Sequence, residues 1–426
     1  MIKRKLIQNL NNEKNNKKIS VVLGPRQVGK TTLLKQLFEE LGAKDNGVFL
    51  DMDVLSDYEK LSSYENALNT LKLSGYSENQ NAFFYLFIDE FQRYKGFSKI
   101  IKNIYDHHDN IKIYVSGSSS IKIKDEIQES LAGRKFIHYL LPLDFEEFLI
   151  FKDNAEALKQ IANIRKLEGK EIHLDLLAKM LEEYMIFGAY PEVVLTGNRN
   201  EKVQILNSIF DLYVKKDLVE FLNVNKILKV KKLIDLLGVN HGQKIKYEQL
   251  ASTCGASEYE VKNYIELLKE SFLIYELRPY FSNKNKEIVK IPKVYFLDPG
   301  VRNYFVNNFN PTAKRSDGGF LFEGFVLAEL LKTGNKKLNY WQDKNKNEVD
   351  FIIDKIHKQF PLEVKFKNKL KYNNFTGLKA FASQYPASKH FYCISRSSQY
   401  IEKINGNRIQ VMLPFNLKSH EWFRNT

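Results

Sequence analysis

Several features that define other protein classes are scarce in this chain of 426 residues. It has two cysteines, Cys254 and Cys393, which lie far apart and lack the spacing of metal ligands. No apolar stretch reaches the roughly 18 residues of a membrane span, and the longest, FFYLFI, has the length of a strand. The basic N-terminus MIKRKLIQNLNNEKNNKK lacks the apolar core of a signal peptide. These absences predict a cytoplasmic protein in a reducing compartment, without disulfides and without membrane association.

Positive charge is abundant and unevenly placed. The formal net charge is +14, and residues 301–426 carry 21 Lys and Arg against 10 Asp and Glu, a net charge of +11. A basic bias concentrated in one segment indicates an anionic partner, most simply nucleic acid, with DNA favoured. The alternative is that the bias only reflects the Lys- and Asn-rich composition of the whole chain.

The stretch ISVVLGPRQVGKTTLLKQLFEEL reads as a strand, a loop and a helix. Its loop has the pattern G-x-x-x-x-G-K-T, in which glycines let backbone N–H groups curl around phosphate oxygens at a helix N-terminus. The lysine of this pattern reaches the β- and γ-phosphates, and the threonine hydroxyl ligates Mg²⁺. The predicted ATP-binding residues of the loop are Gly24, Pro25, Arg26, Gln27, Val28, Gly29, Lys30, Thr31 and Thr32.

A second apolar strand, in FFYLFIDEFQ, ends in two carboxylates. We predict that Asp89 holds Mg²⁺ through water and that Glu90 orients and deprotonates the attacking water. A third strand, in IKIYVSGSSS, places Ser116 where a hydroxyl senses the γ-phosphate. Arg134, in SLAGRKF, is a candidate arginine finger that acts on the nucleotide of a neighbouring subunit, so a homo-oligomer is expected.

These motifs carry a family resemblance. The stretches GPRQVGKTTLL, FIDEFQR, VSGSSS and LAGRKFIHYLLPLDFEEFL resemble a group of bacterial and archaeal AAA-type ATPases. In that family the ATPase is followed by helices, a winged-helix region and a conserved domain of unknown function. FGAYPEVVL, KVYFLDPGVRNYF and NEVDFII with LEVK are similar to its later segments. The resemblance covers almost the whole chain and implies ATP binding and a nuclease-like C-terminal fold.

The middle of the chain has helical periodicity from Asp144 to about Asn225, which predicts a helical lid. The region from YEQLASTCG to KVYFLD then reads as helix, turn, helix and two strands, the outline of a winged helix. Its second helix is net acidic and would repel phosphates, whereas the connection between the strands is basic. DNA contact by this wing, through Lys284, Lys286 and Lys290, and docking against another domain are both open.

The C-terminal segment reads as helix, three strands, helix and a last strand. This order resembles the core of the PD-(D/E)xK nuclease superfamily, in which an Asp and a Glu on adjacent strands hold Mg²⁺ and a lysine activates water. The resemblance assigns these roles to Asp350, Glu363 and Lys365, with Glu323 on the preceding helix. Clustered carboxylates repel one another unless a cation neutralises them, and hydrated oxygen ligands suit Mg²⁺ or Mn²⁺ rather than zinc.

The stretch PLEVKFK leaves one question open. Side chains two residues apart on a strand share a face, so Glu363 and Lys365 lie together. They form either half of a metal site or a solvated ion pair, which contributes little to stability. Three carboxylates, Glu323, Asp350 and Glu363, are the predicted metal ligands of this segment, as Thr31 and Asp89 are in the ATPase segment.

Taken together, the sequence predicts an α/β protein: a P-loop ATPase with a parallel sheet, a helical lid, a winged helix and a restriction-endonuclease-like domain. The expected boundaries are 1–142, 143–224, 225–300 and 301–426. The predicted function is ATP hydrolysis by a protein that acts on nucleic acid and cleaves it with Mg²⁺ or Mn²⁺. The alternative is an NTP-dependent regulatory switch whose C-terminal domain only binds a partner.

Overall fold

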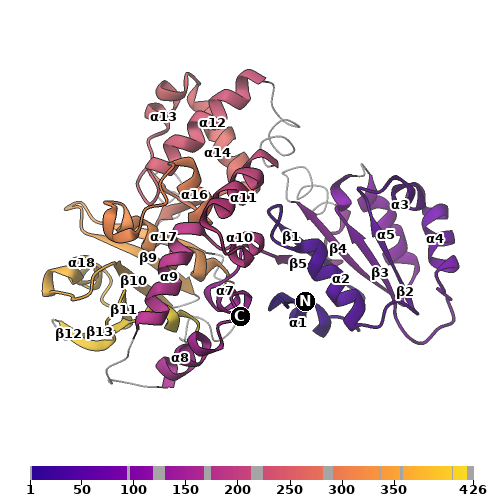
Figure 1. The fold of residues 1–426 in the computed structure, drawn as a ribbon, viewed down its shortest axis with the longest axis horizontal. Helices are drawn as coiled ribbons and strands as arrows, with labels where there is room; N and C mark the ends of the chain where they lie inside the picture. Colours follow the sequence, from indigo (N-terminus) through magenta and orange to yellow (C-terminus); the bar gives the residue numbers. More distant parts are fainter. Residues whose placement is uncertain are drawn as a thin grey trace. The chain divides into compact units, whose positions relative to one another are not determined.

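The computed structural model describes residues 2–93, 96–118, 130–166, 174–212, 224–281, 291–332, 334, 337–355, 358–404 and 406–419. They form two compact units, Met1–Pro142 with Glu270–Phe272, and Leu143–Lys269 with Leu273–Thr426 (Figure 1). Apart from Glu270–Phe272, the predicted ranges 143–224, 225–300 and 301–426 lie in the second unit. Across the described ranges, no helix is both long and apolar enough to cross a membrane.

The first unit contains a five-stranded parallel sheet of order β2-β3-β4-β1-β5. Its strands are β1 (Ile19–Gly24), β2 (Gly47–Asp51), β3 (Phe84–Asp89), β4 (Ile111–Ser118) and β5 (Lys135–Tyr139). The helices are α1 (Leu6–Asn12), α2 (Lys30–Glu40), α3 (Leu55–Lys60), α4 (Tyr64–Leu73) and α5 (Phe97–His107), with a 3-10 turn η1 (Phe91–Arg93). The central strands are buried along their whole length because helices cover both faces of the sheet.

The order of the strands decides which residues meet at the carboxyl edge of this sheet. Strand β4 lies between β1 and β3, with Gly24 opposite Ser118 and Ile88 opposite Val115. The ends of β1, β3 and β4 therefore lie side by side. In a parallel α/β sheet this edge is where ligands bind.

Helices make up the first half of the second unit. They are α7 (Phe145–Phe151), α8 (Ala155–Lys166), α9 (Asp175–Phe187), α10 (Pro191–Leu195), α11 (Arg199–Leu212), α12 (Val224–Val239), α13 (Tyr247–Cys254) and α14 (Glu258–Glu270). Asp144 begins α7 through a capping box, in which its carboxylate accepts the amide of Glu147 at 2.8 Å and the Glu147 side chain accepts the amide of Asp144 at 3.2 Å. Later helical elements are α16 (Pro299–Phe305), α17 (Gly318–Lys332) and α18 (Thr376–Gln384), and the short turns η3 (Thr312–Lys314), η4 (Tyr372–Phe375) and η5 (Pro414–Ser419).

One mixed sheet of eight strands, in the order β12-β13-β11-β10-β9-β8-β6-β7, runs through the second unit. Its strands are β6 (Ile274–Pro279), β7 (Lys293–Phe296), β8 (Leu338–Gln342), β9 (Glu348–Lys355), β10 (Lys358–Lys365), β11 (Phe391–Ser395), β12 (Tyr400–Ile404) and β13 (Asn407–Met412). The prediction that β11 is the last strand is wrong, since β13 pairs with it in parallel. The boundary expected at residue 300 separates strands of this one sheet, because β6 and β7 precede it and β8 to β13 follow it. Strand β6 pairs in parallel with β8 and so covers the edge of β8.

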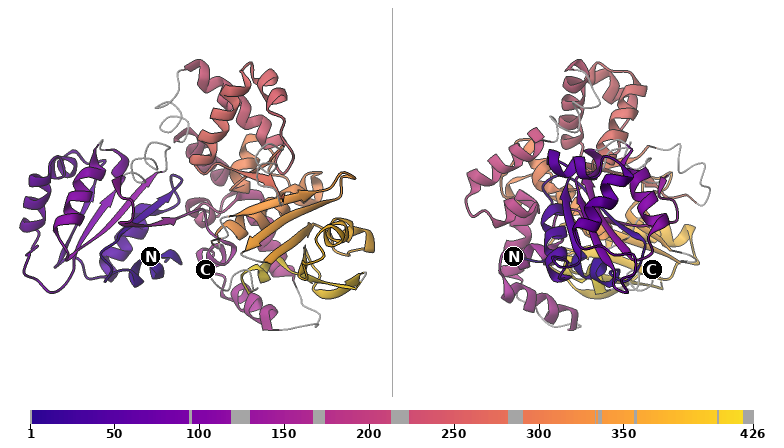
Figure 2. Two further views of the ribbon diagram at one scale, coloured as in Figure 1. Left: turned by 180° about the vertical axis from the view of Figure 1, so that it is seen from behind. Right: turned by 90° about the vertical axis from the view of Figure 1, so that its right-hand side faces the viewer.

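Helices cover both faces of the eight-stranded sheet, whose strands run from orange to yellow in Figure 2. Residues of α17, among them Phe322 and Phe325, pack with Leu362 and Ile394 in one hydrophobic core. On the other face Leu378 and other α18 residues pack with strand residues of β9, β11 and β13 in a second core. Strand β10 is thus sandwiched between two cores, and a charged residue on it is withdrawn from water.

Candidate functional site

The loop between β1 and α2 has the geometry of a phosphate cradle. Gly29 begins α2 with φ 90°, in the left-handed region that favours glycine. A Cβ on Gly24 would lie 2.1 Å from the carbonyl oxygen of Leu140, so no larger residue fits there. The Lys30 ammonium is buried and donates to the carbonyls of Gly24 (3.1 Å) and Pro25 (2.9 Å). It therefore lies inside the loop that a triphosphate would occupy.

The carboxylate of Asp89 is the meeting point of two hydroxyl groups. Ser116, on β4, donates to Asp89, and Thr31, on α2, is hydrogen-bonded to it as well. Burial raises the pKa of Asp89, and these hydrogen bonds oppose that shift. Three predicted site residues from three separate elements are thus brought together at the carboxyl edge of the sheet.

Glu90 follows directly with φ 51°, a left-handed conformation that costs a non-glycine residue about 1–3 kcal/mol. Such strain persists where the surrounding structure imposes it, commonly at functional sites. The turn η1 begins immediately afterwards, and the Glu90 carbonyl accepts the amide of Arg93 at 3.1 Å.

Arg4 is a residue of this site that the sequence did not predict. Its guanidinium is buried and donates to the carbonyl of Val28, inside the phosphate loop, at 2.9 Å. It also donates to the carbonyl of Leu141, beyond β5, at 2.8 Å. The segment before α1 therefore fixes the phosphate loop against the end of β5. The only related signal in the sequence is the basic character of the N-terminus.

We expect Arg4→Ala to weaken nucleotide binding by about tenfold, because one buried and one partly buried carbonyl lose a charged donor. Each unsatisfied buried group costs about 1–3 kcal/mol. Arg4→Lys should restore the affinity only in part, since an ammonium lacks the planar fork that spans both carbonyls. The measurement is titration with a fluorescent ADP analogue. Lys14→Ala, which removes the same charge from an exposed position just after α1, is the control. Equal affinity of Arg4→Ala and wild type would show that the contact is unrelated to the nucleotide.

Arg134 lies at the other end of the sheet. Its carbonyl accepts the amide of Ile19, the first residue of β1, whereas the phosphate loop follows the last. At 3.3 Å per residue, the five steps along β1 amount to about 17 Å. The guanidinium makes a two-bond ion pair with Asp106 of α5, at 2.8 and 3.1 Å. Arg134 is thus remote from the nucleotide site of its own chain.

The C-terminal candidate residues meet on β9 and β10. These strands are antiparallel, with Phe351 opposite Leu362, and the Asp350 carboxylate accepts the amide of Val364 at 2.7 Å. Glu363 is 5 % exposed, and one of its carboxylate oxygens, Oε2, is buried without a hydrogen-bond partner. Burial, followed by the charge of Asp350, raises the pKa of Glu363 to about 8. Asp350 and Glu363 are therefore close enough to affect each other.

Lys365 forms an ion pair with Glu363, as their spacing predicted. The interpretation of this pair as a solvated strand face is wrong, because Glu363 is buried beneath the first turn of α18. A Cβ built on Gly377 would lie 3.4 Å from Oε2 of Glu363. Despite burial, the neighbouring carboxylates raise the pKa of the Lys365 ammonium, so it stays charged.

Glu323, the third predicted carboxylate ligand, is hydrogen-bonded to two side chains of β7. It lies on α17, and its Oε1 accepts from Lys293 of β7 at 3.2 Å and from the hydroxyl of Tyr295. Burial raises the pKa of Glu323 to about 7, and Lys293 opposes that shift. Lys293 and Tyr295 were read from the sequence only as part of a strand. In the ranges that the structure describes, no three His, Cys, Asp or Glu side chains form a ready-made metal site.

Exposed lysines follow the end of β10. Lys367, Lys369 and Lys371 lie in the loop that continues from Lys365. This loop is held by Ser397 and Ser398, whose hydroxyls both donate to the carbonyl of residue 368 at 3.1 Å. Next to it, Tyr372 is 61 % exposed and the Lys379 ammonium lies 3.0 Å from the centre of its ring. The predicted basic wing residues Lys284, Lys286 and Lys290 lie outside the described residues.

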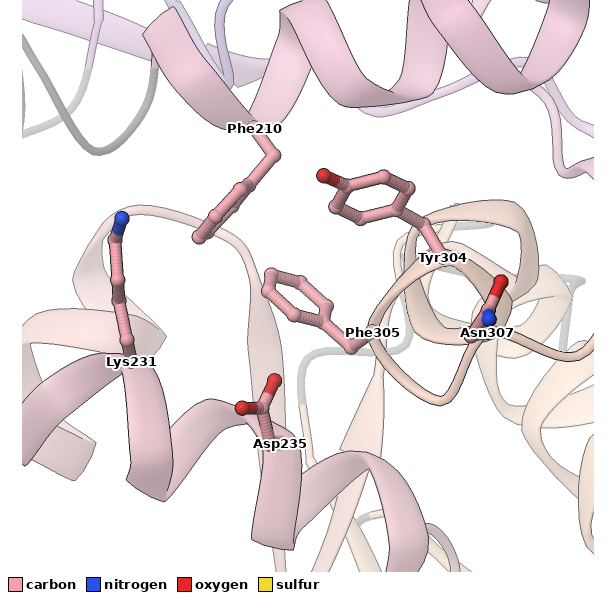
Figure 3. Close-up of a pocket in the computed structure, with 6 residues that line it drawn as sticks. All are labelled: Phe210, Lys231, Asp235, Tyr304, Phe305 and Asn307. Carbon is pink, nitrogen blue, oxygen red and sulfur yellow. The ribbon is translucent and has the colours of Figure 1, made fainter.

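A cavity of about 400 Å³ lies among α11, α12 and α16. Figure 3 shows the rings of Phe210, Tyr304 and Phe305 turned toward one another, with Lys231 and Asp235 of α12 on one side. The rings of Phe210 and Phe305 are edge to face with centres 4.5 Å apart. None of the predicted site residues lines this cavity, so it belongs to neither candidate site.

Three regions of the chain match models of known protein families. Residues 16–149 match a family described as AAA domain, and residues 178–312 and 318–416 match two families described as domains of unknown function, DUF8612 and DUF4143. The overall match to a solved Aeropyrum pernix ORC1 protein in complex with DNA has a TM-score of 0.31 at 12% identity, covering 71% of this chain and 91% of that one. A similarity this low supports no inference.

Whole-chain relatives are more informative. An uncharacterized protein of Haemophilus influenzae is 26% identical, over 82% of each chain. The uncharacterized protein MJ1544 of Methanocaldococcus jannaschii is 31% identical over 347 residues, which are 79% of this chain and 72% of the relative. The site at the carboxyl edge of the five-stranded sheet lies inside the matched AAA domain. The chain therefore belongs to the family of AAA-type P-loop ATPases that includes MJ1544.

Proposed function

We propose that the first unit binds ATP with Mg²⁺ and hydrolyses it. The observation that carries this is the convergence of Thr31 and Ser116 on Asp89, directly before the strained Glu90. These hydroxyl and carboxylate oxygens are hard ligands that suit Mg²⁺. When bound, Mg²⁺ neutralises the charge that develops on the β- and γ-phosphates. Lys30 turns from the loop carbonyls to the phosphates, and Glu90 takes a proton from the attacking water.

The position of Arg134 supports action in an oligomer. It lies about 17 Å along β1 from the phosphate loop of its own chain, so it stabilises the transition state only on a neighbour's nucleotide. To do so it must exchange its ion pair with Asp106 for a phosphate. An arginine finger of this kind accelerates hydrolysis by about 10³-fold or more.

We expect Arg134→Ala to lower ATP turnover by a factor on the order of 10³ with little change in nucleotide affinity. Asp106→Asn provides the matched variant, because it breaks the same ion pair but keeps the arginine. Its turnover should equal or exceed that of wild type. Equal losses in both variants would mean that the pair is only structural. Light scattering that shows a strict monomer with saturating ATP analogue would also contradict the proposal.

For the second unit we propose metal-dependent cleavage of nucleic acid at Asp350, Glu363 and Lys365. The unpartnered Oε2 of Glu363 and the neighbouring carboxylate of Asp350 provide oxygen ligands for one Mg²⁺ or Mn²⁺ ion. Such ions are commonly held by one or two carboxylates, with water and phosphate completing the shell. When bound, the metal polarises the scissile phosphate and lowers the pKa of a bound water. Lys365 stays charged and orients that water or the phosphate.

Nucleic-acid binding is proposed for the loop that follows β10. Lys367, Lys369 and Lys371 are exposed within a few residues of Lys365, so a phosphate backbone held by them would lie beside the carboxylates. Tyr372, which lies between Lys371 and Asn373 in the chain, offers an exposed ring for stacking on a base. The region 225–300, which has helices α12–α14 and the hairpin β6–β7, is proposed as a winged helix.

The second candidate function is an NTP-dependent switch whose C-terminal domain binds a partner without chemistry. One observation favours it: Lys293 and Lys365 already provide cations beside Glu323 and Glu363. A buried acidic cluster that is neutralised by lysines needs no metal for stability. The two functions differ in whether divalent metal is bound.

The experiment that separates them uses the full chain with labelled single-stranded and duplex DNA. Cleavage products that depend on Mg²⁺ or Mn²⁺ are expected, and ATP should change their rate. Binding of DNA without products under every condition, with an affinity that changes with ATP, would support the switch instead. A Glu363→Gln variant is the control for contaminating nuclease.

A further inference from the structure

Strand β7 places a buried lysine beside the C-terminal carboxylates. Lys293 is 4 % exposed, and its Nζ lies 2.6 Å from Oε1 of Glu348 and 3.2 Å from Oε1 of Glu323. Tyr295, two residues along the same face of β7, donates its hydroxyl to the same oxygen of Glu323. The hairpin β6–β7 precedes the nuclease-like segment in sequence. It therefore contributes two side chains to the acidic cluster of that segment, which consists of Glu323, Glu348, Asp350 and Glu363.

The carboxylates of this cluster differ in what they contact. Oε1 of Glu323 accepts from both Lys293 and Tyr295, whereas Oε2 of Glu363 is buried without a hydrogen-bond partner. A buried carboxylate held by an ammonium and a hydroxyl has its charge compensated. A buried carboxylate oxygen without any donor is costly and requires an ion or a water.

We propose that Lys293 and Tyr295 are positioning residues that keep Glu323 as a charge partner, so that one divalent cation is held by Asp350 and Glu363 alone. The Lys293 ammonium takes the place beside Glu323 that a second metal ion would otherwise take. This inference rests on the proposed metal-dependent function, and it assigns Glu323 a different role from the one predicted from the sequence.

The test is Mn²⁺ binding to the full chain without nucleotide, measured from the free-ion signal in electron paramagnetic resonance. Wild type should bind one ion, and Glu363→Gln should weaken binding at least about tenfold. Glu323→Gln should change the affinity less than about twofold. Lys293→Met should tighten binding about fivefold or add a second ion, because it frees Glu323, and the double variant with Glu323→Gln should reverse that gain.

Lys244→Met is the matched control, since Lys244 contacts Glu348 at 3.0 Å but is not bonded to Glu323 in the hydrogen bonds of the described residues. It should leave Mn²⁺ affinity unchanged. If Glu323→Gln loses Mn²⁺ as Glu363→Gln does, Glu323 is a ligand and the inference fails while the metal-dependent function stands. If wild type binds no Mn²⁺, both fail. Because Glu323→Gln removes no positive charge from the core, it decides the matter even if Lys293→Met does not fold.

Discussion

Replacing Glu90 with Gln is expected to slow ATP hydrolysis by about 10²–10⁴-fold, the usual contribution of a general base. Nucleotide binding should survive, because Lys30 and the loop amides that we propose to hold the phosphates are untouched. The amide keeps the size of the side chain and its strained backbone but cannot take a proton from water. Protein incubated with ATP should therefore retain unhydrolysed ATP, which is measured by quenching and chromatography of the bound nucleotide.

Two further variants make this result specific. Glu39→Gln introduces the same chemical change at an exposed position of α2 and should hydrolyse ATP at the wild-type rate. Lys30→Ala should retain no nucleotide at all, which separates loss of binding from loss of chemistry. If Glu90→Gln converts ATP to ADP as fast as wild type, another group is the base.

The second large effect is expected at Asp350. Mn²⁺ at 100 times its dissociation constant should stabilise the wild-type fold by about 2.7 kcal/mol, which raises the Tm of the second unit by about 5 °C or more. Asp350→Asn should abolish both this shift and DNA cleavage. Asparagine can still accept the amide of Val364, so the strand pairing survives. The apo variant should be at least as stable as the wild-type apo protein, because burial and the charge of Asp350 together disfavour ionised Glu363.

Asp354→Asn is the control for this prediction. Asp354 lies on the same strand, is partly exposed and accepts a hydrogen bond from Gln359 at 3.3 Å. Its variant should keep the metal-induced shift in full. An Asp350→Asn protein that is stabilised by Mn²⁺ as strongly as wild type would place the metal elsewhere.

Local patterns predicted which residues of the first unit lie at the carboxyl edge of its sheet, because each of these patterns is short and continuous in sequence. The loop Gly24–Thr31 and the start of α2 are consecutive, and a single helix N-terminus fixes their geometry. Asp89 and Ser116 were predictable as well, since each ends an apolar strand and parallel strands end at one edge. The role of Arg4 was not, because an arginine that reaches a carbonyl 24 residues away has no periodic signature.

In the C-terminal segment the positions of the strands could be predicted from the sequence, but their order in the sheet could not. Strands β8 to β11 and helix α18 lie where the alternation of apolar residues and the turns placed them. The pairing of β6 with β8 was not predictable, because strand order depends on long-range packing that the apolar pattern does not encode. For the same reason Lys293 was read as part of a wing strand, although it lies buried against Glu323 and Glu348.

The most direct measurement is anomalous diffraction at the manganese edge from crystals grown with Mn²⁺ and a non-hydrolysable ATP analogue. The account predicts two peaks per chain. One should lie beside Thr31 and Asp89 at the phosphates, and the other should lie about 2.2 Å from carboxylate oxygens of both Asp350 and Glu363, close to the distances typical of such ions. A single peak at the nucleotide, with Asp350 and Glu363 binding no metal, would contradict the nuclease proposal and leave an ATPase with a non-catalytic C-terminal domain.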